Sequence, residues 1–345
     1  MPNRTAYMTA RRKIEIRNEE MPSPGPDEVL VKLEYIGICG SDIHYYEHGK
    51  IGDFVVEGDF ILGHECAGTI QQVGSNVHHL QVGDRVALEP GATCGQCEYC
   101  KSGRYNLCPD VKFLATPPHH GCLSEYIAYP ANMAFKLPDQ VSTREGALIE
   151  PLAVGLHAAG QGKVKLGDTV VILGTGAIGL MTILACKAFG ATEIIAVDII
   201  DKRLEFASKL GATHVINALR DNVQDEVVRL TGGKGARVVF ETAGSEKTVQ
   251  ETPYLVERGG TIVLVGLAAK DIIPYNFMQI MWKEASIESV FRYRNLFPIA
   301  IDAIADGKIA VKEMITHEFD FVDTERAFDF VIEHKEDVVK AVIKV

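Results

Sequence analysis

The chain has 345 residues, of which 47% are hydrophobic, and its formal net charge is -11 at pH 7. One hydrophobic core usually stops growing at roughly 250 to 300 residues, so two domains are expected. The negative charge repels nucleic acid and anionic membranes, so neither is expected as a partner.

The first 20 residues are charged and lack the apolar stretch of a signal peptide, which predicts a cytoplasmic protein. The longest apolar run, residues 170–186, contains three glycines. It is also shorter than the roughly 20 residues that span a bilayer. A buried strand, turn and helix are therefore expected there.

The first half of the chain alternates short apolar runs with proline and glycine turns, for example VLVKLEYIGICG (29–40), GTIQQVG (68–74) and VGDRVALEP (82–90). This pattern predicts a β-rich, barrel-like domain over residues 1–155.

Potential metal ligands are found in this half. They are Cys39, the pair His64-Glu65, and Glu150, whose apolar surroundings make an unpaired carboxylate costly. Together they suit a zinc ion that keeps an open position for substrate. Each alone has a structural explanation: a core thiol, a satisfied polar residue or an ion-pair partner.

Four cysteines lie close together in a lobe at about residues 90–110, namely Cys94, Cys97, Cys100 and Cys108. In a chain expected to be cytosolic this spacing favours metal over disulfides, and four thiolates suffice for a structural zinc. An iron–sulfur cluster is the alternative because Pro109 follows Cys108, but the seven-residue gap before Cys108 disfavours it.

From about residue 165, strands and helices alternate, beginning with TVVILG and including a helix over 245–260 before the strand TIVLVG (261–266). This predicts an α/β, doubly wound domain with a parallel sheet over 156–288. Residues 289–345 are too few for a third domain and are expected to return and complete the first.

A glycine turn follows the first of these strands: Gly174, Thr175, Gly176, Ala177, Ile178 and Gly179. Asp198 closes the next strand, as in the dinucleotide-binding fingerprint. We expect Gly174 to form the tight turn, Gly176 to admit the pyrophosphate and Gly179 to pack helix against strand. Asp198 favours NAD over NADP, whereas Lys202 and Arg203 keep NADP open.

These motifs, in this order, resemble the zinc-containing medium-chain dehydrogenases over essentially the whole chain. The segments GICGSDIHYYEHGKIGDFVVE, GRYNLCPDVKFLATPP, GALIEPLAVGLHA and VFRYRN are similar to the polyol branch, which includes sorbitol, L-iditol and xylitol dehydrogenases. The resemblance implies a GroES-like catalytic domain beside a Rossmann domain, an active site in the cleft between them, and a homotetramer or homodimer.

For the catalytic zinc, the resemblance implies Cys39, His64 and Glu65 as ligands, with Glu150 binding either the metal or its water. Classical members of the family use a second cysteine as the third protein ligand. In this chain no cysteine stands near Glu150, and this difference favours a polyol substrate. Ser41 and His44 are implied as a proton relay. Polyol contacts are expected from Tyr45, Phe113, Arg292 and Tyr293, although the tyrosines could simply pack and Arg292 could bind a cofactor phosphate or an ion-pair partner. The cofactor contacts are expected from the glycine turn, Asp198 and Arg203.

The expected activity is therefore zinc-dependent, NAD-linked oxidation of a sugar alcohol to the ketose, with one catalytic and one structural zinc per chain. The polyol itself stays open. The alternatives are another zinc dehydrogenase acting on butanediol, threonine or a phosphorylated polyol, and a non-enzymatic protein on a dehydrogenase scaffold.

Overall fold

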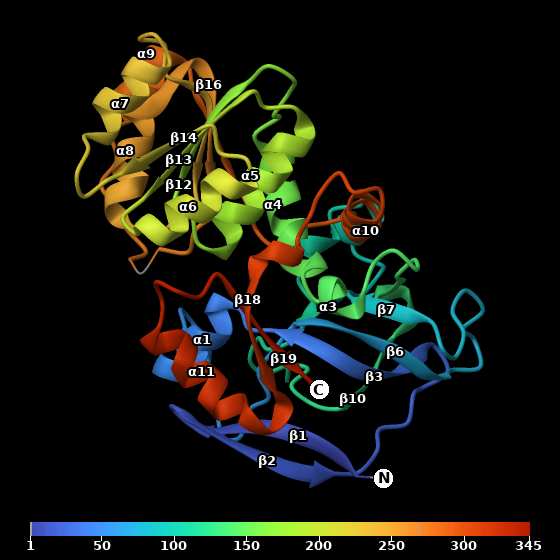
Figure 1. The fold of residues 1–345 in the computed structure, drawn as a ribbon. Helices are drawn as coiled ribbons and strands as arrows, with labels where there is room; N and C mark the ends of the chain where they lie inside the picture. The colour runs from blue at the N-terminus through green and yellow to red at the C-terminus, as the bar shows by residue number, and fades with distance from the viewer. Residues whose placement is uncertain (1, 269) are drawn as a thin grey trace. The chain divides into compact units, whose positions relative to one another are not determined.

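A computed structural model of the chain describes residues 2–268 and 270–345. The chain folds into two compact units, one made of Met1–Glu150 with Phe297–Val345 and the other of Pro151–Leu296 (Figure 1). In the described part of the chain, no helix combines the length and apolarity needed to cross a bilayer.

The first unit is built on a seven-stranded sheet in the order β11-β7-β6-β3-β19-β18, with β10 also paired to β3. The bounds of these strands are β3 Glu28–Gly37, β6 Glu65–Val73, β7 Arg85–Leu88, β10 Tyr126–Pro130, β11 Ala134–Lys136, β18 Ile315–Asp320 and β19 Lys340–Lys344. Because β19 pairs with β3, the C-terminal segment completes a sheet begun near the N-terminus.

Smaller elements surround this sheet. They are the two-stranded sheets β1–β2 (Asn3–Ala10, Lys13–Glu19), β4–β5 (Lys50–Ile51, Phe54–Val55) and β8–β9 (Gly91–Ala92, Lys112–Phe113), and the helices α1 (Gly40–His48), α2 (Glu98–Lys101), α3 (Thr143–Gly146), α10 (Phe297–Ala305) and α11 (Thr324–Glu333). Val29, Val31 and Leu33 of β3 are fully buried in the core of this unit. Leu30, between them, is buried as well, so this part of the strand is covered on both faces.

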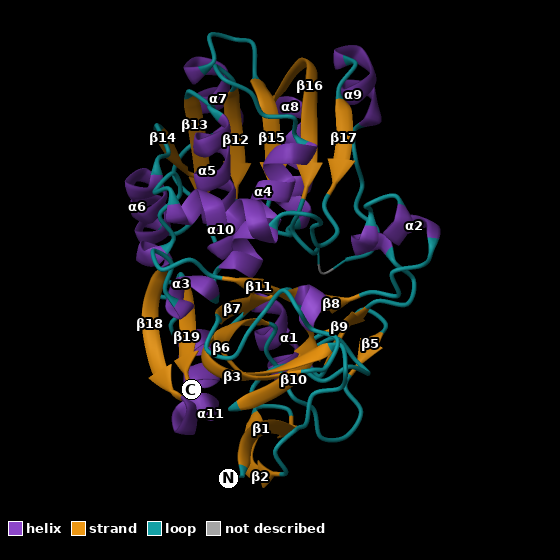
Figure 2. Ribbon diagram, turned by 90° about the vertical axis from the view of Figure 1, so that its right-hand side faces the viewer, coloured by secondary structure: helices purple, strands orange, loops and turns teal. Residues whose placement is uncertain are grey.

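The second unit is a doubly wound domain, as predicted. Its six parallel strands run in the order β14-β13-β12-β15-β16-β17 (Figure 2). Their bounds are β12 Thr169–Leu173, β13 Glu193–Asp198, β14 His214–Asn217, β15 Ala236–Glu241, β16 Val256–Leu264 and β17 Ser286–Ser289. Four consecutive residues of β12, 170–173, are fully buried, as expected for a strand covered on both faces.

Helices lie on both faces of this sheet: α5 packs beside α6, and α8 contacts both α7 and α9. Their bounds, with the helix at the unit boundary, are α4 Ile149–Gln161, α5 Ala177–Phe189, α6 Asp201–Leu210, α7 Val223–Leu230, α8 Glu246–Leu255 and α9 Phe277–Lys283.

The helix predicted over 245–260 is too long. It ends at Leu255, and β16 starts at Val256 instead of Thr261. Pairing with β15 draws Val256 into the sheet opposite Ala236, and the register shifts before Thr261 is reached. Gly259 has a φ of +71° in this irregular stretch, a conformation that glycine adopts without strain.

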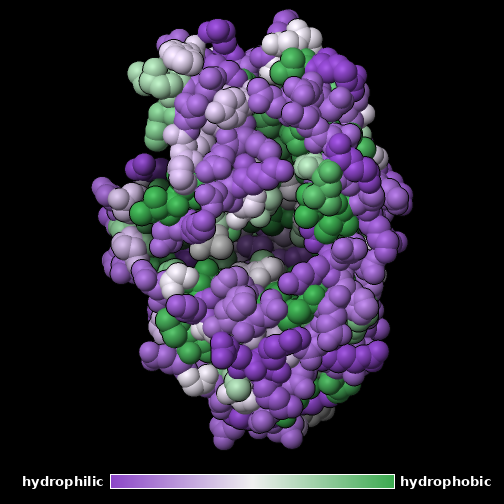
Figure 3. All heavy atoms as spheres, turned by 90° about the vertical axis from the view of Figure 1, so that its left-hand side faces the viewer, coloured by the Kyte–Doolittle hydropathy of each residue, from purple (hydrophilic) through white to green (hydrophobic). Residues whose placement is uncertain are grey.

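The molecular surface in Figure 3 is mainly hydrophilic, with apolar residues gathered in separate groups.

Candidate catalytic metal centre and nucleotide site

Three potential ligands meet where β3 and β6 run side by side. Gly37, at the end of β3, is paired with Glu65, at the start of β6, and Cys39 follows two residues after Gly37. One ligand atom from each of Cys39, His64 and Glu65 lies within 4.8 Å of the others. A thiolate, an imidazole and a carboxylate that converge in this way fit a zinc ion that keeps a further position open.

The carboxylate of Asp42 contacts this ligand group from the side of His64 Nδ1. Asp42 is fully buried, and its Oδ1 lies 3.4 Å from Nδ1 of His64. It also accepts hydrogen bonds from the backbone N–H groups of Gly63, at 3.0 Å, and Cys39, at 3.1 Å. Burial acts to raise the pKa of Asp42, but the charge of His64 and these N–H donors outweigh burial and lower it. A carboxylate behind a ligating histidine fixes the orientation and tautomer of the ring.

Glu65 is held by a second buried charge. Nζ of Lys340, on β19, donates to both oxygens of Glu65 and to the carbonyl oxygen of Ile38, at 3.1 Å. Burial alone would lower the pKa of Lys340, but the negative charges of Glu65 and Cys39 raise it. The Glu65 carboxylate therefore faces a cation as well as the other two ligands.

Glu150 lies apart from the three-residue group, although it is close enough for its charge to act on Lys340. Its side chain is buried in the first turn of α4, where the helix dipole stabilises a negative charge.

The two relay candidates lie on α1. Ser41 is half-buried, and His44 is exposed with its Nδ1 2.9 Å from the carbonyl oxygen of Lys50.

The expected polyol contacts are distributed over both units. The ring of Phe113 lies 5.8 Å from that of His64, beside the ligand group. Tyr45 is buried in the core of the first unit, 6.3 Å from the ring of Phe60. Arg292 and Tyr293 belong to the second unit, where Tyr293 is buried and the Arg292 guanidinium lies 4.7 Å from the ring of Phe291.

The four cysteines of the lobe converge on one point. Sγ of Cys94 lies 3.9 Å from Sγ of Cys100 and 3.5 Å from Sγ of Cys108. A tetrahedral zinc with bonds of about 2.3 Å separates its sulfurs by about 3.8 Å, whereas an iron–sulfur cluster holds its cysteines farther apart. Backbone N–H groups of Gln96 and Cys97 lower the pKa of Cys94 to about 7, which favours the thiolate. The site fits structural zinc, and all eight cysteines are free thiols.

The glycine turn has the close contacts that only glycine allows. Gly174 has a φ of +95°, and a Cβ there would lie 2.8 Å from Ala243. A Cβ on Gly179 would lie 2.0 Å from the carbonyl oxygen of Gly174. At Gly176, by contrast, a Cβ would meet nothing within 4 Å, so the helix α5 begins at an open space. A helix N-terminus next to open space is suited to a phosphate.

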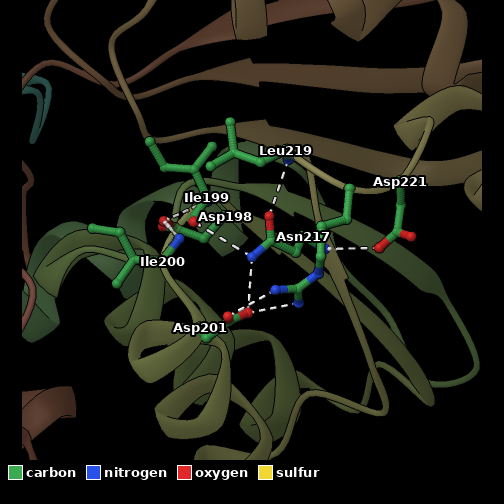
Figure 4. A network of polar contacts seen from close by, with 8 residues as sticks. Asp198, Ile199, Ile200, Asp201, Asn217, Leu219 and Asp221 are labelled. Carbon is green, nitrogen blue, oxygen red and sulfur yellow. Dashed lines mark hydrogen bonds and ion pairs between the residues drawn. The ribbon is translucent and has the colours of Figure 1, made fainter.

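Asp198, at the end of β13, is buried beside this turn. Its Oδ2 accepts hydrogen bonds from the backbone N–H of Thr175 at 2.7 Å and from its hydroxyl at 2.9 Å. Its Oδ1 accepts the N–H groups of Ile199 and Ile200, at 2.7 and 3.0 Å (Figure 4). The neighbouring Asn217 donates to Asp201 at 2.8 Å, which ties the loop after β13 to β14.

A cavity of about 480 Å³ adjoins the turn and Asp198, and Arg203 also lines it. Lys202 is exposed and is not among its lining residues. Other lining residues come from the loop after β15 and from α8, and they were not predicted as cofactor contacts: Thr242, Ala243, Ser245, Lys247, Thr248 and Glu251.

Asp42 and Lys340 are the residues at the metal group that sequence reasoning missed. Asp42 could be recognised from the local sequence, since it stands three residues after Cys39 at the start of a helix. An acidic side chain at this position accepts a hydrogen bond from the backbone N–H of the N-cap residue, here Cys39. Lys340 is separated from Glu65 by 275 positions, and nothing near it in the sequence indicates a buried partner.

Two family models match the chain: the alcohol dehydrogenase GroES-like domain over residues 25–139 and the zinc-binding dehydrogenase domain over residues 177–306. Among curated proteins, the chain is 48% identical to the zinc-type alcohol dehydrogenase-like protein YdjJ of Escherichia coli, covering 100% of this chain and 99% of that one. It is 45% identical to sorbitol dehydrogenase of Bacillus subtilis, covering 99% and 96%. A solved E. coli oxidoreductase of unknown specificity superposes with a TM-score of 0.96 at 47% identity, covering 100% and 99%.

Proposed function

Because the chain belongs to the zinc-containing medium-chain alcohol dehydrogenases, we propose that it oxidises a sugar alcohol such as sorbitol, L-iditol or xylitol to the ketose, with NAD as hydride acceptor. The observation that carries the proposal is the donor set at the metal group: Cys39, His64 and Glu65 converge, and a second buried carboxylate, Glu150, lies nearby. The identity to a sorbitol dehydrogenase adds support for a polyol.

Cys39, His64 and Glu65 would hold the catalytic zinc, and the four lobe cysteines the structural one. When bound, zinc supplies a Lewis acid that lowers the pKa of a substrate hydroxyl, and NAD supplies the hydride acceptor. Glu150 acts as the general base for the hydroxyl proton, directly or through a water. Asp42 keeps His64 in place, so the ligand geometry is fixed before substrate arrives.

The proton then leaves towards solvent through Ser41 and His44. His44 is exposed, and in the tautomer that donates from Nδ1 to the Lys50 carbonyl, its Nε2 can accept a proton. Phe113 forms one wall of the substrate site beside His64, and Tyr45, Arg292 and Tyr293 contribute to polyol recognition.

For the cofactor, the cavity beside the glycine turn receives the adenosine part of NAD. The Asp198 carboxylate lines this cavity and opposes a 2′-phosphate. Arg203 and Lys247 line the same cavity, so NADP is the competitor to test.

The test is the rate of reduced cofactor formation by zinc-replete protein, with NAD or NADP, over a panel of polyols beside ethanol, butanediol, threonine and a phosphorylated polyol. Reduction of NAD with one or two polyols is the expected result. Activity only with a non-polyol moves the enzyme to another branch. No activity with any substrate, despite bound zinc and nucleotide, indicates a non-enzymatic member.

A further inference from the structure

Two histidines lie side by side on the exposed surface of α1. His44 and His48 are four residues apart, so they share one face of the helix. Both side chains are exposed, and their ring centroids lie 4.7 Å apart with an angle of 69° between the ring planes. Two histidines at this helical spacing can present a pair of nitrogen ligands to one metal ion.

The separation of the two rings agrees with a shared ion. Zinc bonds an imidazole nitrogen at about 2.0 to 2.1 Å, so two rings bound to one tetrahedral zinc have their centres about 5 Å apart. The observed 4.7 Å is close to this value, and exposed side chains can reach it by rotation alone. The backbone of α1 therefore need not move, and water supplies the remaining ligands.

His44 also makes the hydrogen bond that is typical of a ligating histidine. Its Nδ1 lies 2.9 Å from the carbonyl oxygen of Lys50. Because a carbonyl oxygen only accepts, the proton of this bond is on Nδ1, and Nε2 of the neutral ring keeps a free lone pair. Ligating histidines almost always donate their other ring N–H to such a partner, which fixes the orientation of the ring. One of the two ligands is thus already oriented.

The charges near the pair favour a cation. Glu47, next to His48 in the sequence, adds a carboxylate to this part of the helix, and its Oε2 lies 4.0 Å from Nζ of Lys335. The chain as a whole has a net charge of -11, so its field attracts positive ions. Imidazole ligands suit zinc, copper and nickel. The expected ligand is therefore a divalent transition-metal ion.

We propose that His44 and His48 form an inhibitory site for a divalent transition-metal ion such as zinc, in addition to the catalytic and structural sites. The ion occupies Nε2 of His44, the nitrogen through which the proposed relay passes the substrate proton towards solvent. Its binding therefore lowers turnover while the other two ions stay in place. The inhibition rests on the proposed function, whereas the metal site does not.

The test adds zinc to full-length protein that already holds two zinc ions per chain, and it compares wild type with His48→Gln. His48 lies outside the proposed catalytic machinery, so this variant should keep normal turnover without added zinc. The matched control is His78→Gln, since His78 is also exposed in the first unit but lies outside α1. Bound zinc is counted by equilibrium dialysis with elemental analysis, turnover is measured with a polyol and NAD, and folding is checked by circular dichroism.

We expect wild type and His78→Gln to bind a third zinc per chain and to lose most of their turnover as it binds, through kcat and not through KM. His48→Gln should keep two zinc ions and should need at least about tenfold more added zinc for the same inhibition. His44→Gln should also fail to bind the third ion, which provides a second variant if His48→Gln does not fold.

Three results would overturn the proposal or a part of it. Absence of a third zinc in wild type overturns the site, and a third zinc that persists in both His48→Gln and His44→Gln overturns its location. Binding of the third zinc with unchanged turnover overturns the link to proton release. If the protein oxidises no substrate at all, the proposed function fails, while the zinc count still decides whether the histidine pair binds metal.

Discussion

Nζ of Lys340 lies 2.7 Å from Oε1 and 2.8 Å from Oε2 of Glu65, and both side chains are buried. This pair joins the last strand of the chain to the ligand group, so the C-terminal segment contributes directly to the metal centre. A buried carboxylate that loses its cation is costly unless another positive charge replaces it.

Lys340→Met should therefore lower the free energy of unfolding by about 3 to 5 kcal/mol in zinc-free protein. The loss should be smaller with zinc, because the ion provides Glu65 with a positive partner. Urea unfolding of both forms measures this, and Lys344→Met, at an exposed position of the same strand, is the control. An equal loss with and without zinc would mean that Glu65 does not face the metal.

Glu150→Gln should reduce turnover by about 10² to 10⁴, the range typical of a lost general base, while both zinc ions stay bound. Turnover is measured with a polyol and NAD, and metal content by elemental analysis. Glu205→Gln changes an exposed carboxylate on α6 and should leave both unchanged. Loss of one zinc from Glu150→Gln would show that Glu150 is a direct ligand instead.

The glycine turn permits a comparison of two neighbouring substitutions. Gly179→Ala places a Cβ 2.0 Å from a backbone oxygen, so it should cost stability, about 1 to 3 kcal/mol, as well as NADH affinity. Gly176→Ala meets no protein atom within 4 Å, so it should weaken NADH binding with stability preserved. Thermal unfolding and calorimetry separate the two effects. Gly160→Ala, also without neighbours in the helix α4, is the control. Normal NADH binding by Gly176→Ala would place the pyrophosphate elsewhere.

Burial raises the pKa of Glu89 to about 7, although the Tyr105 hydroxyl 2.7 Å away opposes the shift. The folded protein thus keeps this carboxyl protonated up to about pH 7, whereas the unfolded chain releases the proton near the ordinary value of 4.5. Between these values the folded state binds more protons, so the contribution of Glu89 to the free energy of unfolding falls as pH rises.

Glu89→Gln removes this pH dependence. The variant should gain up to about 3 kcal/mol relative to wild type between about pH 5 and about pH 8. Urea unfolding at several pH values measures the difference, with the exposed Glu98→Gln as control. Parallel pH curves for Glu89→Gln and wild type would contradict the raised pKa.

The features of the fold and site that depend on local spacing can be predicted from the sequence. The four-cysteine lobe, the glycine turn and the parallel sheet follow from short motifs and from alternating strands and helices. Contacts between distant segments give no such signal: Lys340 meets Glu65 only because β19 pairs with β3. The helical pattern of residues 245–260 also extends beyond the end of α8 at Leu255, because sheet pairing at Val256 outweighs the local helical preference.

The most direct test of the account removes and restores the catalytic metal. Chelation that leaves the lobe zinc in place should abolish polyol-dependent reduction of NAD while NADH still binds, and added zinc should restore the rate. In the Cys39→Ser variant, added zinc should not restore the rate of NAD reduction. Full polyol oxidation by protein that has lost the metal bound at Cys39, His64 and Glu65 would contradict the central claim.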